Sequence, residues 1–268
     1  MKIHKRFTLI FLAMAPLFAI SAQEYAVAQL ENSPRHHEWK AIKSNDRNLH
    51  LFIAYPEVAE KATTVILIHE NRGLNDWARS MTDQLAEAGY LAVAPDLLSG
   101  ASDQYEKTKD YPNSDEARSA IYSLEQENVT RDLLNTLSFA KGIEAGNGKV
   151  VVMGFCWGGS QTFRLATQTD GIEAAMVFYG TAPDDKSLLA TIETPIYGFY
   201  GENDNRVNST IEETEQKMKE LNKTYLYQIY DGAGHAFMRR GDDPDGKGPN
   251  VDARNAAWSR LKSILEKI

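Results

Sequence analysis

Three residues in the second half of the chain have the types and the order of a nucleophile, an acid and a base. Cys156, the only cysteine, lies in GFCWGG (residues 154–159), which follows an apolar run and precedes helical spacing. This G-x-nucleophile-x-G form predicts a tight turn that places the thiol at a helix N-terminus, where the helix dipole favours a thiolate. Asp204 in FYGENDNRV and His235 in IYDGAGHAFM each follow a predicted strand. Together the three residues predict a catalytic triad.

A parallel β-sheet would bring these residues to one edge. From residue 49 onward, short apolar runs alternate with stretches of helical spacing, which is typical of a mostly parallel sheet with helices on both faces. Sites in such sheets form at the carboxyl ends of the strands.

The polar stretch 99–127 is either a functional rim or a plain surface loop, with a short helix expected at 115–124. Strands are expected at 49–55, 63–70, 91–97, 149–155, 174–180, 195–201 and 225–232, and helices at 76–90, 128–143, 158–169, 209–221 and 251–268.

The first 28 residues differ from the rest of the chain. MKIHKR is basic, FTLIFLAMAPLFAI is apolar, and small residues follow in SAQ and AVAQ. This order is typical of a secretory signal peptide, with cleavage after Ala22 or Ala28, and the apolar run is shorter than the roughly 20 residues of a membrane span. We therefore expect a signal peptide in residues 1–28 and a single domain in residues 29–268. The processed protein should be secreted or periplasmic, with no membrane span.

The composition argues against several other classes of protein. The 268-residue chain has a formal charge of −8, and residues 1–28 carry +2, so the remainder carries −10. Because no basic stripe offsets this charge, we expect no nucleic-acid partner. The six histidines show no spacing typical of a metal site, and we expect neither a metal nor a cofactor. A lone cysteine cannot form an internal disulfide, so in an oxidising compartment it should be buried or used in chemistry.

Beyond the triad, the chain resembles the dienelactone hydrolase family of α/β-hydrolases from about Trp39 to the C-terminus. The resemblance is carried by LIHENRGLN, GYLAVAPDLL, GFCWGG, FYGENDNRV and GAGHAFMRR. It implies an α/β-hydrolase fold. It also implies that Cys156, His235 and Asp204 form a triad that cleaves an ester or lactone bond through an acyl-enzyme, as in a carboxymethylenebutenolidase.

The resemblance implies roles for residues around the triad as well. Glu70, at the end of a predicted strand, matches a family glutamate that lies beside the thiol and helps to deprotonate it. The backbone N–H groups of Asn71 and Trp157 would form the oxyanion hole, in agreement with the general rule for the residue after the nucleophile. Tyr179 matches an aromatic residue of the family pocket. Arg239 matches one of two family arginines that bind a substrate carboxylate.

One position departs from the family pattern. The second carboxylate-binding arginine would lie shortly after PDL, where this chain has Gly100. The absence of that arginine predicts weaker selection for a carboxylate, so that neutral esters or lactones would be hydrolysed at least comparably to dienelactone. Another arginine, such as Arg72 or Arg118, could take its place from a different direction.

The sequence thus predicts a monomeric hydrolase that acts on a small-molecule ester or lactone. Three alternatives stay open: a general carboxylesterase or thioesterase of the same family, a redox sensor that uses Cys156, and an inactive binding protein. A redox sensor would need a resolving cysteine or an external thiol, and the chain has no second cysteine. The intact triad argues against an inactive binding protein.

Overall fold

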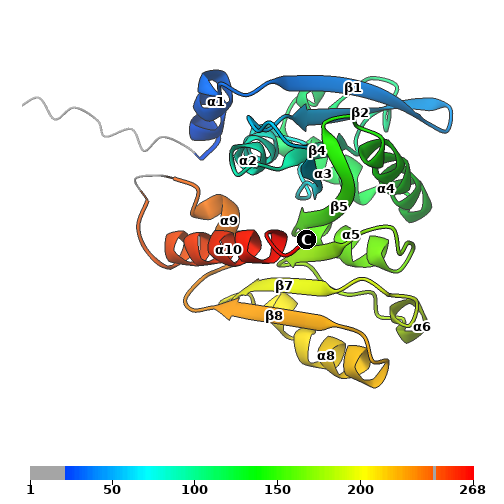
Figure 1. Ribbon diagram of the computed structural model, residues 1–268, viewed down its shortest axis with the longest axis vertical. Helices are drawn as coiled ribbons and strands as arrows, with labels where there is room; N and C mark the ends of the chain where they lie inside the picture. Colours follow the sequence, from blue (N-terminus) through cyan, green and yellow to red (C-terminus); the bar gives the residue numbers. More distant parts are fainter. Residues whose placement is uncertain (1–21, 244–245) are drawn as a thin grey trace, which may run out of the picture.

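One eight-stranded sheet forms the centre of the computed structural model, which describes residues 22–243 and 246–268 (Figure 1). Its strands are β1 (His37–Ser44), β2 (Arg47–Ala54), β3 (Ala62–Ile68), β4 (Leu91–Asp96), β5 (Gly146–Phe155), β6 (Ala174–Phe178), β7 (Ile196–Gly201) and β8 (Tyr225–Tyr230). They lie in the order β1-β2-β4-β3-β5-β6-β7-β8. β2 pairs antiparallel with both β1 and β4, and all other pairs are parallel. The predicted mostly parallel sheet is confirmed.

Helices connect most of these strands. They are α1 (Ala22–Asn32), α2 (Asp76–Glu87), the 3-10 helix η1 (Thr108–Asp110), α3 (Ser114–Tyr122), α4 (Gln126–Lys141), α5 (Trp157–Ala166), α6 (Lys186–Leu189), α7 (Asn205–Asn208), α8 (Ile211–Glu220), α9 (Phe237–Arg240) and α10 (Pro249–Leu265). In Figure 1, α1 lies next to α2 near the β1–β2 end of the sheet, and α8 packs on β8 at the other end. The predicted helices are present, and α1, η1 and the short α6, α7 and α9 were not predicted.

The sheet is buried on both faces because helices cover both. Along β3, Val65 and Leu67 belong to the core formed with α1, α2, α9 and α10, whereas Ile66 and Ile68 belong to the core formed with α4, α5 and α8. Successive strand residues point to opposite faces, so both sets must be apolar. This is why the parallel strands appear in the sequence as continuous apolar runs. Burial on both faces also holds rigid the strand ends that carry the site.

The sequence pattern missed strand β1. It pairs antiparallel with β2 through a two-residue turn, and it forms an edge of the sheet. Trp39 and Lys40 are exposed, and Ser44 is the only one of its eight residues that is fully buried. An edge strand with one solvated face need not be continuously apolar, so the segment has no run of the kind that marks the central strands.

Most of the predicted signal peptide, residues 1–21, lies outside the described residues. Helix α1 begins at Ala22 and packs against α2, so the expected domain start at residue 29 falls inside this helix. Ala26 is fully buried, and the side-chain oxygen of Gln29 accepts hydrogen bonds from Ser80 at 2.8 Å and Gln84 at 3.2 Å. Within the part of the chain that the structure describes, no helix is both long and apolar enough to cross a membrane.

The contacts of α1 make the two predicted cleavage positions distinguishable. Cleavage after Ala22 would remove only the first residue of α1, whereas cleavage after Ala28 would remove most of the helix. A chain that begins at Gln29 should therefore be less stable than one that begins at Gln23. Loss of the buried Ala26, and of the helical turns that hold Gln29 against Ser80 and Gln84, should lower the free energy of unfolding by about 2 kcal/mol, and Tm by roughly 4–8 °C. Circular dichroism melts would measure this difference, and equal Tm values would show that α1 adds nothing to stability.

Candidate active site

The carboxyl ends of five consecutive strands bring the predicted site residues together. Cys156 follows β5, Asp204 follows β7 and His235 lies in the loop after β8. Glu70 and Tyr179 follow β3 and β6. Because these strands are parallel neighbours, the loops that leave them share one edge of the sheet, where open α/β sheets form their sites.

A chain of hydrogen bonds joins the three residues of the predicted triad. The Nε2 atom of His235 lies 3.1 Å from the Sγ atom of Cys156, and its Nδ1 atom lies 2.5 Å from Oδ2 of Asp204. Asp204 is buried, whereas the imidazole is partly exposed. The carboxylate can thus fix the ring orientation and the tautomer, and Nε2 is left to exchange a proton with the sulfur.

The charge on His235 depends on both of these contacts. Burial of the ring lowers its pKa, but the hydrogen bonds to Asp204 and Cys156 and the charges of both residues outweigh burial and raise the pKa to about 9. At neutral pH the imidazole therefore holds a proton. A protonated imidazole next to the sulfur stabilises a thiolate, which is the nucleophilic form of cysteine.

Cys156 adopts an unusual backbone conformation, with φ 55° and ψ −115°. Such a conformation is uncommon for a residue with a side chain, and it persists only where the surroundings enforce it. The flanking backbone is packed too closely for a Cβ atom: one on Gly158 would lie 2.3 Å from the carbonyl oxygen of His69, and one on Gly154 would lie 2.2 Å from that of Gly158. The glycines of GFCWGG are therefore required by the close approach of the strand end to α5.

The two predicted oxyanion donors lie beside the thiol. Asn71 and Trp157 both line the cavity that contains Cys156. Trp157 is the first residue of α5, so its backbone N–H has no acceptor within the helix and is free for an oxyanion. The side-chain amide of Asn71 donates a hydrogen bond to the Tyr122 hydroxyl at 3.0 Å, which connects this loop to α3.

The buried His69 fixes the loop that carries Glu70 and Asn71. Its Nε2 atom accepts a hydrogen bond from the backbone N–H of Leu97 at 3.3 Å, so the proton is on Nδ1, which donates to the carbonyl oxygen of Glu70 at 2.8 Å. Burial lowers the pKa of His69 to about 4, which keeps the ring neutral. The ring also stacks on the indole of Trp157, with 5.7 Å between centroids. His69 therefore has a positioning role between the two oxyanion segments.

Glu70 is paired with Arg239 rather than with the thiol. Its Oε2 atom accepts a hydrogen bond from Nε of Arg239 at 2.8 Å, and its Oε1 atom accepts one from the Tyr179 hydroxyl at 3.3 Å. Burial, together with the negative charges of Glu70 and Cys156, raises the pKa of Tyr179 well above its usual value, so the phenol stays protonated. Among the described residues, no hydrogen bond joins Glu70 to Cys156. Arg239, predicted to bind a substrate carboxylate, is neutralised by Glu70 and does not line the cavity.

A cavity of about 460 Å³ opens beside Cys156, a size that suits a small-molecule substrate. The sequence assigned no site residue to the segments that form α3 and α7, except that Arg118 on α3 was named as a possible replacement for the missing arginine. Arg206 could have been found, because it lies two residues after the predicted acid. Tyr122 could not, because the polar stretch that contains it has no distinctive pattern. The cavity is lined by Asn71, Arg118, Tyr122, Cys156, Trp157, Ser160, Tyr179, Thr181, Arg206 and His235.

Gly100 lies outside this cavity. Its N–H donates a hydrogen bond to the carbonyl oxygen of Glu106 at 3.2 Å, and a Cβ atom added to it would lie 3.4 Å from the side chain of Arg47. A side chain at position 100 would therefore extend from the backbone toward Arg47 on β2 and not toward Cys156. Arg72 lines a separate hollow of about 280 Å³. Of the two replacements that the sequence left open, only Arg118 lines the catalytic cavity.

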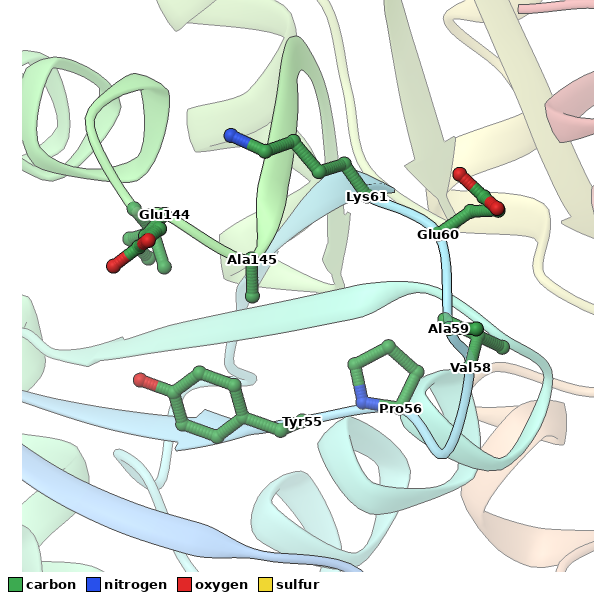
Figure 2. Close-up of a pocket in the computed structure, with 9 residues that line it drawn as sticks. Tyr55, Pro56, Val58, Ala59, Glu60, Lys61, Glu144 and Ala145 are labelled. Carbon is green, nitrogen blue, oxygen red and sulfur yellow. The ribbon is translucent and has the colours of Figure 1, made fainter.

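A larger hollow, of about 560 Å³, lies away from the triad. Figure 2 shows that Tyr55 and Pro56 line it from one segment, and Glu144 and Ala145 from another. This hollow is next to the start of β3, whereas the triad lies at the opposite ends of the parallel strands. None of its lining residues is a cysteine, serine or histidine, so it offers no counterpart to the nucleophile and base at Cys156.

Comparison with known proteins agrees with this geometry. The model of the dienelactone hydrolase family matches residues 49–268, which include every residue of the triad. The chain belongs to the dienelactone hydrolase family. It is therefore a hydrolase of the class that acts on ester and lactone bonds, as the sequence predicted.

Individual relatives cover most of the chain. A candidate carboxymethylenebutenolidase of Saccharolobus solfataricus is 30% identical over 257 residues, which are 84% of this chain and 96% of that protein. A candidate 2-oxo-3-(5-oxofuran-2-ylidene)propanoate lactonase of Bradyrhizobium is 27% identical over 212 residues, 75% of this chain and 83% of that one. Among solved structures, a candidate dienelactone hydrolase of Klebsiella pneumoniae matches 87% of this chain and 99% of its own, with a TM-score of 0.75 and 22% identity. That likeness shows the α/β-hydrolase fold.

The tight turn at Cys156 can be tested with Gly158→Ala. The added methyl would overlap the carbonyl oxygen of His69, so α5 must shift away from β3. We expect the free energy of unfolding to fall by about 2–4 kcal/mol and hydrolysis to be lost. Gly142→Ala is the control, because its Cβ would meet only ordinary contacts of 3.5 Å or more and should change stability by no more than about 0.5 kcal/mol. Urea unfolding measures both, and wild-type stability in Gly158→Ala would contradict the packing argument.

Proposed function

We propose that the protein hydrolyses a small lactone or ester through a covalent acyl-enzyme on Cys156, in the manner of a carboxymethylenebutenolidase. The observation that supports this proposal is the continuous contact from Sγ to His235 at 3.1 Å and on to Asp204 at 2.5 Å. The names of the relatives support a lactone as the substrate. The cavity beside the sulfur and the free N–H at the start of α5 provide for a reacting carbonyl.

In the first half-reaction, Cys156 forms a bond to the substrate. With the thiol proton on Nε2 of His235, the thiolate adds to the carbonyl carbon, and the carbonyl electron pair moves onto oxygen. Backbone N–H groups of Trp157 and Asn71 stabilise this oxyanion. When the carbonyl re-forms, the ester C–O bond breaks and the leaving oxygen takes the proton from His235. The product is a thioester on Cys156, and in a lactone the new hydroxyl stays attached to the acyl chain.

In the second half-reaction, water releases the acyl group. His235, now neutral, accepts a proton from water as the water oxygen adds to the thioester carbonyl. The C–S bond then breaks, and a carboxylic acid leaves. The sulfur departs as a thiolate beside the protonated His235, which restores the starting pair.

The proposed role of Glu70 depends on Arg239. The resemblance implies that Glu70 helps to deprotonate the thiol, but Arg239 and Tyr179 each donate to one of its oxygens in this arrangement. The base in contact with the sulfur is His235. We therefore propose that His235 activates the thiol and that Glu70 acts on it only after Arg239 has moved away.

We also propose that the enzyme works outside the cytoplasm after removal of a signal peptide. The proposal is supported by the order of basic, apolar and small residues in residues 1–28. The contacts of α1 with α2 favour cleavage after Ala22, because this position keeps all of the helix except its first residue in the processed chain.

Alkylation of the single thiol tests the proposed nucleophile. Iodoacetamide should add one label per chain and abolish hydrolysis of p-nitrophenyl acetate, of a butenolide lactone and of an aryl thioester, because Cys156 is the only cysteine. Excess substrate should slow the labelling, and Cys156→Ala should be both unlabelled and inactive. Mass spectrometry and initial rates measure these outcomes, and the relative rates separate a lactonase from a general esterase or thioesterase. Full labelling with retained turnover would rule out Cys156 as the nucleophile.

The raised pKa of His235 predicts the pH dependence of kcat/KM. Below about pH 9 the free enzyme holds the imidazole proton that the leaving oxygen needs, and above it that proton is lost, so the alkaline limb should fall near pH 9. Asp204→Asn removes a contact that raises this pKa, so the limb should move toward 6.5 and the rate should drop by about 10³- to 10⁴-fold. An alkyl ester is the right substrate, because its leaving oxygen requires a proton. A limb that stays at the same pH in Asp204→Asn would assign it to another group.

A further inference from the structure

The loop that carries His235 is held by two other elements of the fold. It joins β8 to α9, and its first neighbour is the segment that follows β7. There the backbone N–H of Asn203 donates a hydrogen bond to the carbonyl oxygen of Ala233 at 2.8 Å. Asn203 directly precedes Asp204, so this bond joins the loop of the proposed base to the segment that carries the acid.

The second element that holds the loop is the C-terminal helix α10, which lies next to α9 in Figure 1. Asn250 is the second residue of this helix, and its Oδ1 atom accepts a hydrogen bond from the backbone N–H of Gly234 at 3.0 Å. Gly234 directly precedes His235. Asn250 is not among the residues that line the cavity beside Cys156, so it can affect the reaction only through this loop.

The backbone of Asn250 also contacts the chain on the far side of the histidine. Gly241 follows α9, and a Cβ atom added to it would lie 2.3 Å from the carbonyl oxygen of Asn250. The start of α10 therefore contacts the segment around His235 at two points. Its side chain binds before the histidine, at Gly234, and its carbonyl group packs after it, at Gly241.

The segment between these two contacts has a conformation that requires support. Ala236, next to His235, adopts a left-handed backbone with φ 61° and ψ 32°. A residue with a side chain seldom adopts this conformation, and it keeps it only where the surroundings enforce it. The N–H of Arg240 donates to the carbonyl oxygen of Ala236 at 2.9 Å, which supports the side toward α9. Without an acceptor for Gly234, the peptide before His235 would be free to rotate, and the imidazole would turn with it.

We propose that Asn250 is a positioning residue for His235 and that the C-terminal helix thereby contributes to catalysis. The proposal rests on hydrolysis at Cys156. The imidazole must reach Sγ at 3.1 Å and Asp204 at 2.5 Å at the same time, so a small rotation of the loop weakens both contacts. A displacement of about 1 Å can lower the rate of a reaction by about 10²-fold.

Two substitutions of Asn250 separate its acceptor from its shape. Asn250→Leu keeps about the same size without an acceptor, whereas Asn250→Asp keeps an oxygen that can accept from Gly234 and is favourable at a helix N-terminus. With ethyl butyrate, Asn250→Leu should lower kcat by about ten- to a hundredfold and leave KM within about twofold, because the cavity is unchanged. Asn250→Asp should keep kcat within about threefold of wild type. Asn255→Leu, the same change at an exposed position of α10, is the control and should behave like wild type.

The reactivity of the thiol provides a readout that a loss of stability alone would not change. A displaced imidazolium no longer stabilises a thiolate, so at pH 7 and 25 °C iodoacetamide should label Cys156 about three- to tenfold more slowly in Asn250→Leu than in wild type. Asn250→Asp should be labelled at nearly the wild-type rate. Circular dichroism melts report whether each variant is folded at the temperature of the assay.

Hydrogen exchange of the Gly234 amide tests the contact in the unaltered protein. In wild type and in Asn250→Asp this amide should exchange about 10²-fold or more slowly than an unprotected amide, and in Asn250→Leu the protection should be largely lost. NMR spectroscopy resolves this single amide. Unprotected exchange in wild type would overturn the proposal even if Asn250→Leu failed to fold.

The kinetic results can overturn the proposal as well. Wild-type kcat in Asn250→Leu, or an equal loss of kcat in Asn250→Leu and Asn250→Asp, would show that the acceptor has no role. An equal loss in Asn255→Leu would show that any change in α10 has the same effect. Hydrolysis by Cys156→Ala at the wild-type rate would instead contradict the proposed function. Exchange at Gly234 would still report on the contact with Asn250, so the two failures are distinguishable.

Discussion

The close approach of backbone to backbone at the end of β5 is the constraint on which the site depends. Gly154 and Gly158 let the strand end, the start of α5 and the carbonyl groups after β3 pack closer than any side chain would permit. This packing holds Cys156 at a positive φ, and it places the sulfur over the edge of the sheet. The strain of such a residue, about 1–3 kcal/mol, is offset by burial throughout a sheet that helices cover on both faces. The core thus supplies the rigidity that the nucleophile requires.

Charge around the sulfur is arranged in two separate pairs. His235 and the buried Asp204 form one pair, and Glu70 and Arg239 form the other. The positive charge of Arg239 neutralises the Glu70 carboxylate, which would otherwise repel a thiolate at Cys156. An unpaired buried carboxylate would be costly, whereas a paired one can sit close to the reaction centre. Because each pair spans two different strand ends, the electrostatics of the site is a property of the assembled sheet and not of any single loop.

The central strands, the long helices and the contact among Cys156, His235 and Asp204 could be predicted, because each has a local signal: apolar runs, helical spacing, and a glycine-flanked cysteine followed by an acid and a histidine after strands. The sequence pattern missed β1, whose exposed edge has no such run, α1, which was assigned to the signal peptide, and the helices η1, α6, α7 and α9, which are too short for a period. The partner of Glu70 could not be predicted, because Arg239 is 169 residues away in the chain and was assigned to a substrate. The position of residue 100 was also beyond reach, because only the fold shows that it faces Arg47.

The long sequence separations within the predicted triad determine when the thiol acquires its neighbours. Cys156 and His235 are 79 residues apart, and Asp204 and His235 are 31 apart, so their contacts exist only once the sheet is complete. In an extended chain the single cysteine has none of these neighbours and is an ordinary thiol. Its reactivity would appear together with the cavity that limits access to it. The proposed nucleophile would therefore become reactive only when the chain has folded.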